Sequence, residues 1–195
     1  MKGKLEGKSQ NLKAFMFLHR TRDLLFRCQD RVVAESGLTA EQYSVLVAIA
    51  FLDAPVRATD IGRWMDRKVN SVSMIVDRMV KAGLVRRARD LPDRREVRLA
   101  MTSKGEQALK SANPPVARLV EEVFSSLSRD QTETLIRLLE TLRGRALQHC
   151  YPEVNTEDLL SYETEDMDRF LKRMSRYTPG GEPPVKRRRS ARRRE

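Results

Sequence analysis

Residues 69–87 read VNSVSMIVDRMVKAGLVRR, and their pattern is the most informative about the architecture of this chain. Its apolar positions recur at the spacing of one face of an α-helix. They are Val72, Ile75, Val76 and Met79. Gly83 follows where a helix would end, because glycine readily adopts the left-handed conformation that closes many helices. The stretch therefore predicts a helix over residues 69–82 with one buried face.

The opposite face of this helix carries mainly short polar side chains, which let a helix approach another molecule closely. The major groove of DNA, about 12 Å wide, admits one α-helix. Asparagine can pair there with adenine, serine can donate or accept, and a lysine at the helix start can reach a phosphate. The residues of this helix expected to contact DNA are Lys68, Asn70, Ser71, Ser73, Met74 and Arg78.

The segments on either side of this helix complete the arrangement. A short helix is expected before it, over residues 58–66, and two short strands after it, over about 84–90 and 96–101. A turn containing proline separates the strands, and Arg94 and Arg95 at its tip can reach the neighbouring minor groove. A helix, a turn, a second helix and a β-hairpin form a winged helix-turn-helix.

The fold class predicted for the whole chain is mainly α, with six main helices, a two-stranded wing and a C-terminal extension. The helices are expected over residues 11–36, 39–52, 58–66, 69–82, about 103–127, and from 128 to about 150. Capping boxes are predicted at Thr39 with Gln42 and at Ser128 with Gln131, and Thr102 or Ser103 starts the fifth helix. Pro114 and Pro115 are expected to break or sharply bend that helix.

Positive charge is concentrated in three parts of the 195-residue chain, whose net charge is +11. Residues 57–104 carry 13 basic and six acidic side chains, and residues 1–20 and 179–195 are basic as well. This distribution predicts a polyanionic partner, most simply double-stranded DNA, with a merely solvated basic surface as the alternative.

The chain divides into four expected parts. They are a basic tail over residues 1–10, a winged-helix domain over 11–150, a partly helical extension over 151–178 and a disordered basic tail over 179–195. Within the domain, the DNA-binding lobe spans about 38–103, and the dimerisation helices span about 11–36 and 104–150. The extension carries an apolar helical face, and its role stays open between strengthening a dimer and contacting a partner.

Several function classes are excluded by what the sequence lacks. The longest apolar run, from Val45 to Leu52, is far shorter than the roughly 20 residues of a membrane span, so we expect a cytoplasmic protein with no membrane partner. The two cysteines and two histidines have no metal-ligand spacing, so no metal site is expected. No phosphate-binding glycine loop or nucleophile motif is present, so we expect neither an enzyme nor a cofactor.

Four motifs follow one another along the chain: VSMIVDRM at 72–79, GLVRR at 83–87, DRR at 93–95 and MTSKG at 101–105. In order and spacing they resemble the MarR family of transcriptional regulators, over about residues 10–150. Met79 and Met101 stand where leucine is usual in that family. The double proline and everything after residue 150 lie outside the pattern.

The resemblance implies a homodimer built from the first and last helices. It also implies repression of transcription that a small ligand, often phenolic, or cysteine oxidation relieves. The ligand normally binds between the dimerisation helices and the DNA-binding lobe. Carried onto this sequence, Asp77 or Asp93 would brace the wing by holding Arg95, which enters the minor groove in relatives.

The residues themselves agree with a dimer, because the first and sixth helices carry wide apolar stripes without an evident partner. A twofold dimer places its two recognition helices about one DNA turn, roughly 34 Å, apart, so the operator should be an inverted repeat.

Candidate ligand contacts are fewer and weaker. Relatives that sense aromatic acids often place a basic residue on the first helix, which makes His19 and Arg22 candidates. Tyr43 and Trp64 are further candidates, although Trp64 is expected to be part of the core and Tyr43 is more often a helix staple, here with Leu38, than a pocket wall. Cys28 lies on an apolar stripe and is expected to be a small buried residue rather than a redox sensor. Cys150 is expected near a helix end and exposed, and again not as a redox sensor.

The sequence thus predicts a sequence-specific DNA-binding transcriptional regulator. We expect a ligand-responsive repressor that binds an inverted-repeat operator as a homodimer, with an aromatic or phenolic effector. The alternative is a non-specific nucleoid or architectural protein that uses the same basic surface and both tails.

Overall fold

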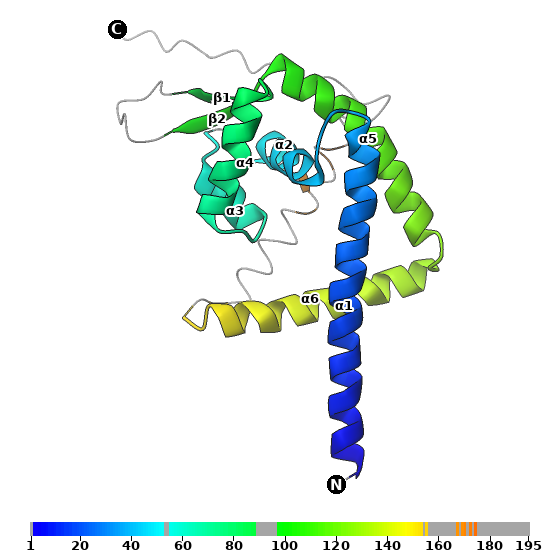
Figure 1. Ribbon diagram of the computed structural model, residues 1–195. Helices are drawn as coiled ribbons and strands as arrows, with labels where there is room; N and C mark the ends of the chain where they lie inside the picture. The colour runs from blue at the N-terminus through cyan, green and yellow to red at the C-terminus, as the bar shows by residue number, and fades with distance from the viewer. Residues whose placement is uncertain are drawn as a thin grey trace, which may run out of the picture.

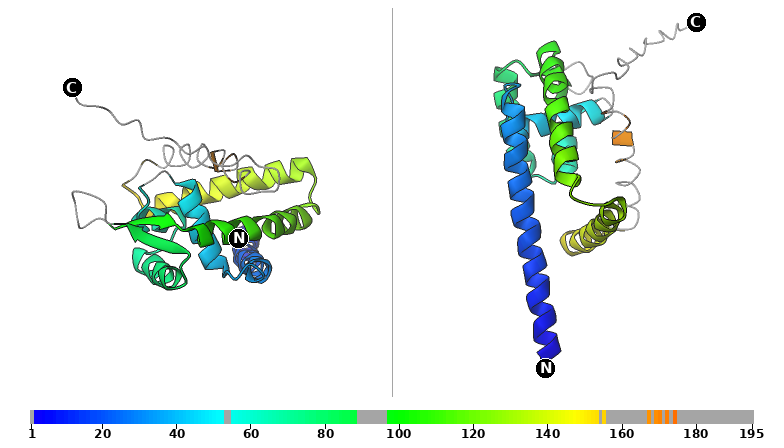
Figure 2. Two further views of the ribbon diagram at one scale, coloured as in Figure 1. Left: turned by 90° about the horizontal axis from the view of Figure 1, so that it is seen from above. Right: turned by 90° about the vertical axis from the view of Figure 1, so that its right-hand side faces the viewer.

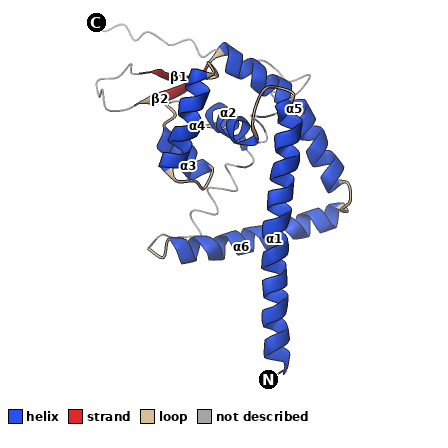
Figure 3. Ribbon diagram, viewed as in Figure 1, coloured by secondary structure: helices blue, strands red, loops and turns tan. Residues whose placement is uncertain are grey.

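The computed structural model describes residues 2–52, 55–88 and 97–153, and after them residues 155, 167, 169, 170, 172 and 174; of residues 2–8 it describes the backbone. The elements in chain order are α1 (Lys2–Ala34), α2 (Ala40–Phe51), α3 (Ala58–Trp64), α4 (Val69–Lys81), β1 (Val85–Ala88), β2 (Arg98–Met101), α5 (Ser103–Phe124) and α6 (Arg129–Cys150) (Figure 1). The described part of the chain is mainly helical, as predicted, with one small sheet (Figure 3).

The elements form a lobe and an outer set of helices. Helices α2, α3 and α4 and the two strands lie together, whereas α1 and α5 extend away from them and α6 crosses beyond the lobe (Figure 1). The N-terminal half of α1 reaches past the other described helices (Figure 2). None of the described helices is both long and apolar enough to cross a membrane.

The lobe has one hydrophobic core, to which every element around it contributes. Its fully enclosed side chains include Val33, Val45, Leu46, Ile61, Val72, Val76, Met79, Val85 and Leu109. The four apolar residues predicted to face inward from α4 are all buried there. Burial of a Val, Leu or Ile side chain contributes about 1.5–3 kcal/mol, so this cluster is the main stabilisation of the lobe.

Local signals start several of the helices as predicted. Gln42 N donates to Thr39 Oγ1 at 3.2 Å, and Thr39 N donates to Gln42 Oε1 at 3.0 Å, which completes the capping box of α2. Ser128 and Gln131 make the same reciprocal pair at α6. Thr102 caps α5, which settles the choice between Thr102 and Ser103.

Two glycines close helices in the left-handed conformation. Gly83 has φ +72° and follows α4, where Leu84 N donates to Met79 O at 2.9 Å. Gly37 has φ +71° and follows α1. Both positions require a residue without a Cβ penalty, which is why glycine marks these helix ends in the sequence.

Two expectations about helix extent are wrong. Helix α1 begins at Lys2 rather than at residue 11, so residues 2–10 continue the helix instead of forming a tail. Extending an existing helix is far easier than nucleating one, and Lys, Glu, Gln and Leu are good helix formers. Helix α5 likewise continues through Pro114 and Pro115, so the expected break is wrong, whereas its ribbon curves in Figure 1.

The double proline is tolerated because of where it falls. Each ring removes the N–H that would bond to the carbonyl four residues earlier, at Lys110 and Ser111. Both of those residues are exposed, so water can hydrate their carbonyls. On the other face of the same turns, Leu109, Ala112 and Asn113 are buried and hold α5 in place.

The wing is a two-stranded antiparallel sheet, and residues 89–96 between its strands lie outside the described residues. Val85 pairs with Met101, and Ala88 pairs with Arg98. Leu99 N also donates to Val56 O at 2.8 Å, which joins the wing to the segment before α3. The base of the wing is therefore joined to buried residues of the lobe.

Candidate nucleic-acid interface

The outer face of α4 is open to solvent over its whole length. Asn70, Ser71, Met74 and Arg78 are exposed, with Met74 60% accessible, and Lys68 just before the helix is exposed too. Ser73 is half-buried at the edge of this face. We call this set the α4 outer face. The structure thus brings the six predicted contact residues of α4 to one helix, five of them fully on its free side.

Asp77 lies on the same outer face, where a free carboxylate would repel DNA phosphates. Its Oδ1 accepts a hydrogen bond from Arg87 Nη2 of β1. The pair joins the middle of α4 to the first strand of the wing. Arg87 thereby neutralises Asp77 and braces the hairpin against α4.

The predicted brace involved a different arginine. Asp93, Arg94 and Arg95 of the wing tip lie outside the described residues, so the expected contact with Arg95 stays a prediction. Arg87 was not among the predicted contact or bracing residues, although it lies in the GLVRR motif and is the third residue of β1. Side chains along a strand point alternately to its two faces, so only every second residue of β1 can face α4. This alternation was the signal in the sequence that could have identified Arg87.

The base of the wing is locked onto the end of α4. Thr102 Oγ1 donates to Gly83 O at 2.6 Å, and Lys104 Nζ donates to Ala82 O at 2.8 Å. A Cβ on Gly105 would lie 2.2 Å from Leu84 O, closer than atoms can approach. The residues of the MTSKG motif therefore pack the start of α5 closely against the turn between α4 and β1.

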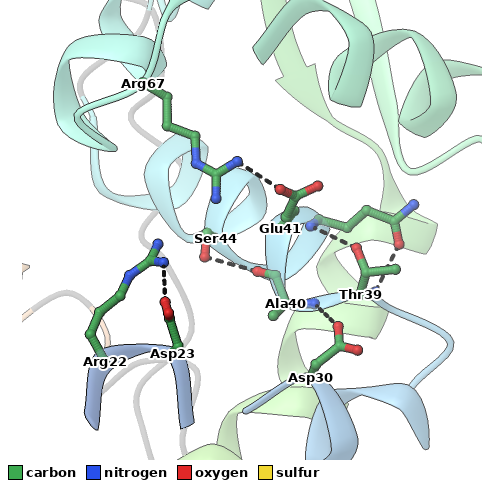
Figure 4. A network of polar contacts seen from close by, with 9 residues as sticks. Arg22, Asp23, Asp30, Thr39, Ala40, Glu41, Ser44 and Arg67 are labelled. Carbon is green, nitrogen blue, oxygen red and sulfur yellow. Dashed lines mark hydrogen bonds and ion pairs between the residues drawn. The ribbon is translucent and has the colours of Figure 1, made fainter. Parts of the chain in front are cut away.

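The turn between α3 and α4 is held from two sides. Arg67 Nη1 donates to Glu41 Oε1 of α2 at 2.6 Å (Figure 4), and Arg67 N donates to Gly62 O at 2.8 Å. Arg143 Nη1 of α6 donates to Asp66 Oδ2 at 2.9 Å, and Asp66 has a positive φ of 51°. The turn between the two helices is thus joined to α2 and to α6.

The four candidate ligand residues have separate surroundings. His19 is exposed on α1 against the ring of Phe15, and Arg22 pairs with Asp23 near it (Figure 4). Tyr43 is buried, whereas Trp64 is half-buried with its ring 6.2 Å from that of Phe51. Among the described residues no hydrogen bond or ring contact joins these four, and their role in ligand binding stays a prediction.

Tyr43 makes the most enclosed polar contact of the lobe. Its hydroxyl donates to Asn113 Oδ1 at 2.8 Å and so joins α2 to α5. Burial raises the pKa of Tyr43 to about 12. Asn113 Nδ2 is buried without a hydrogen-bond partner in the described part of the chain. This pair is a packing contact of the core.

Large apolar side chains outside the lobe remain exposed on three helices. They are Leu12, Phe15, Met16, Phe17, Leu18 and Leu24 of α1, Val120, Val123 and Phe124 of α5, and Ile136, Leu138, Leu139 and Leu142 of α6. Cys28 is half-buried and Cys150 is exposed, and both are free thiols. Within the described residues no group of side chains could hold a metal ion.

Comparison with known proteins identifies the family. The MarR family model matches residues 36–96, which contain α2, α3, α4 and the first strand. The transcriptional regulator HosA of Escherichia coli O157:H7 is 31% identical over 105 residues, which cover 54% of this chain and 77% of HosA.

Solved structures show the same fold. The transcriptional regulator MosR of Mycobacterium tuberculosis, in complex with DNA, has a TM-score of 0.60 at 26% identity, covering 71% of this chain and 98% of MosR. The organohalide-sensing regulator RdhR, bound to 2,4-dichlorophenol, has a TM-score of 0.68 at 22% identity, covering 74% of this chain and 85% of RdhR. The chain therefore belongs to the MarR family of winged-helix transcriptional regulators.

Proposed function

We propose that the chain represses transcription by binding an inverted-repeat operator as a homodimer, with α4 in the major groove and the wing tip in the minor groove. The single observation that supports this is the α4 outer face, which is free, polar and fixed in direction by the wing and the turn before it. DNA binding by MosR, a relative with the same fold, supports the same assignment.

Each residue of the α4 outer face has a role in this proposal. Asn70 and Ser71, in the first turn, reach base edges, while Lys68 and Arg78 bind phosphates on either side. Met74 is long and apolar, and it contacts a thymine methyl group or a sugar. No side chain caps the first turn of α4, and Ser71 N donates to Lys68 O at 3.0 Å, so the N–H groups of Val69 and Asn70 are the ones that face a phosphate at the helix start. Ser73, at the edge of the face, contacts the backbone, and Arg94 and Arg95 follow the minor groove.

The exposed apolar side chains of α1, α5 and α6 support a homodimer. A stable homodimer buries such surface, and patches of this extent are rare on monomers. Covering them with the same helices of a second chain gives a twofold interface. That symmetry sets the two α4 helices about one DNA turn, roughly 34 Å, apart.

A small aromatic or phenolic effector is the ligand class that the ligands bound to structural neighbours support best. RdhR was solved with 2,4-dichlorophenol, and the regulator CouR of Rhodococcus jostii with p-coumaroyl-CoA. In this chain the candidate contacts are His19, Arg22, Tyr43 and Trp64. Alanine at His19 or Arg22 should weaken release of DNA by an aromatic acid without changing DNA affinity in its absence.

Selection of bound DNA from a random duplex pool tests the proposal. We expect the selected sites to converge on two inverted half-sites about one turn apart. The Asn70→Ala chain should select the same spacing but lose preference at one base pair in each half-site, which is the signature of direct readout. A pool that returned no consensus would contradict the operator model and favour a non-specific architectural protein.

A further inference from the structure

The C-terminal extension is tied to the lobe through one aromatic contact cluster. Residues 167, 169, 170, 172 and 174 are helical. The Phe170 ring lies 5.6 Å from that of Phe51 in α2, edge to face, and 6.0 Å from that of Trp64 in α3. Because Phe51 and Trp64 are themselves 6.2 Å apart, the three rings form a closed triangle. All three separations lie within the range of favourable aromatic pairs.

The exposure pattern shows which face of the extension is docked. Phe170 and Met174, one helical turn apart, are half-buried and pack against the core of the lobe. Met167 is 57% exposed, and Arg169 and Lys172 are exposed as well. The apolar face is therefore turned toward the lobe and the charged side chains toward solvent.

The docked position matters because α3 is weakly held by its own sequence. It has only seven residues, of which Ile61 and Gly62 are buried. Trp64 ends this helix, directly before the turn that leads into α4. A ring seated on both Phe51 and Trp64 fixes the end of α3 relative to α2, and α4 packs against α3. The orange segment lies beside α2 in the right-hand view of Figure 2.

We propose that Phe170 is a positioning residue for DNA reading. By holding Trp64 against Phe51, it sets the orientation of α3. Because α4 packs against α3, this also sets the orientation with which the α4 outer face enters the groove. The extension acts on the DNA-binding lobe of its own chain rather than on a dimer interface. The family model ends at residue 96, so this device lies outside it. The inference rests on the proposed binding of DNA by α4.

The test compares Phe170→Ala, Phe170→Leu and Met167→Ala in the full chain. Trp64 is the only tryptophan, so its fluorescence reports the cluster without a label. Phe170→Ala should shift Trp64 emission to the red and lower the thermal midpoint by about 3–6 °C. Phe170→Leu should restore most of both, and Met167→Ala, on the solvent side of the same segment, should change neither.

DNA binding separates positioning from mere stabilisation. Well below the thermal midpoint, Phe170→Ala should weaken binding to the selected operator about tenfold and change affinity for a random duplex far less, because binding to a random duplex does not depend on the base contacts that the orientation of α4 sets. An unchanged ratio of the two affinities would overturn the positioning role. Unchanged Trp64 emission and midpoint would overturn the docking itself. A wild-type chain with no preference for any duplex would contradict the proposed function, and Trp64 would still report docking.

Discussion

Replacing Tyr43 by phenylalanine removes one oxygen from the centre of the lobe. That oxygen donates to Asn113 Oδ1 at 2.8 Å, and Asn113 is 3% exposed with its Nδ2 already unpartnered among the described residues. Tyr43→Phe leaves both polar atoms of the Asn113 amide without a partner among the described residues. A buried polar group left unsatisfied costs about 1–3 kcal/mol, so we expect the free energy of unfolding to fall by that amount.

Urea unfolding at a fixed protein concentration measures this loss. Tyr151→Phe is the matched control, because Tyr151 is 56% exposed and its variant should unfold like wild type. The double variant Tyr43→Phe with Asn113→Leu replaces both polar partners by apolar groups. Its loss in free energy of unfolding should be smaller than the sum of the losses of the two single variants. A Tyr43→Phe chain within about 0.5 kcal/mol of wild type would refute the reasoning, since that is the size of an ordinary surface change.

The same pair predicts a pH dependence with a definite sign. The pKa of Tyr43 is about 12 in the folded chain, against the ordinary 10.0. The unfolded chain therefore loses this proton first, and the stability contributed by the neutral hydroxyl is complete below pH 10 and is lost as the pH rises to 12. Tyr43→Phe lacks this loss, so the stability difference between it and wild type should narrow over that interval. A constant difference would contradict the assignment.

Four further changes test other parts of the account. Gly105→Ala forces its Cβ against Leu84 O and should lower the free energy of unfolding by about 1–3 kcal/mol, read by thermal melting. Arg87→Ala should barely change stability, because the ion pair is exposed, but should weaken operator binding by about 1 kcal/mol as Asp77 is left unneutralised, read by fluorescence anisotropy. Leu142→Glu should shift sedimentation toward monomer, because this side chain is 55% exposed on α6. Deleting residues 179–195, which carry seven basic side chains, should weaken binding to all duplexes alike and flatten its salt dependence.

Much of the lobe could be predicted from the sequence because its signals are local. The Thr39–Gln42 capping box and the glycine after α4 act within one helical turn, so the residue types alone indicate them. The buried face of α4 follows from helical spacing for the same reason. The α4 outer face consists of residues that do not take part in this spacing, and most of them are exposed because the opposite face packs against the core.

Contacts between distant segments could not be predicted in the same way. Arg87 and Asp77 meet only because the hairpin folds back on α4, and sequence spacing does not rank Arg87 above the other arginines of the wing. The length of α1 and the continuity of α5 through its prolines depend on tertiary support, which overrides local propensity. Phe170 was part of an evident apolar helical face, but the surface that receives it is formed by two other helices.

Methylation interference on the selected operator tests the central claim most directly. Methyl groups on guanine N7 project into the major groove, whereas those on adenine N3 project into the minor groove. The account predicts that guanine methylation blocks binding at two clusters about one turn apart on one face of the duplex, and that Asn70→Ala removes interference at one position in each. Interference confined to adenine N3, with none in the major groove, would contradict the insertion of α4.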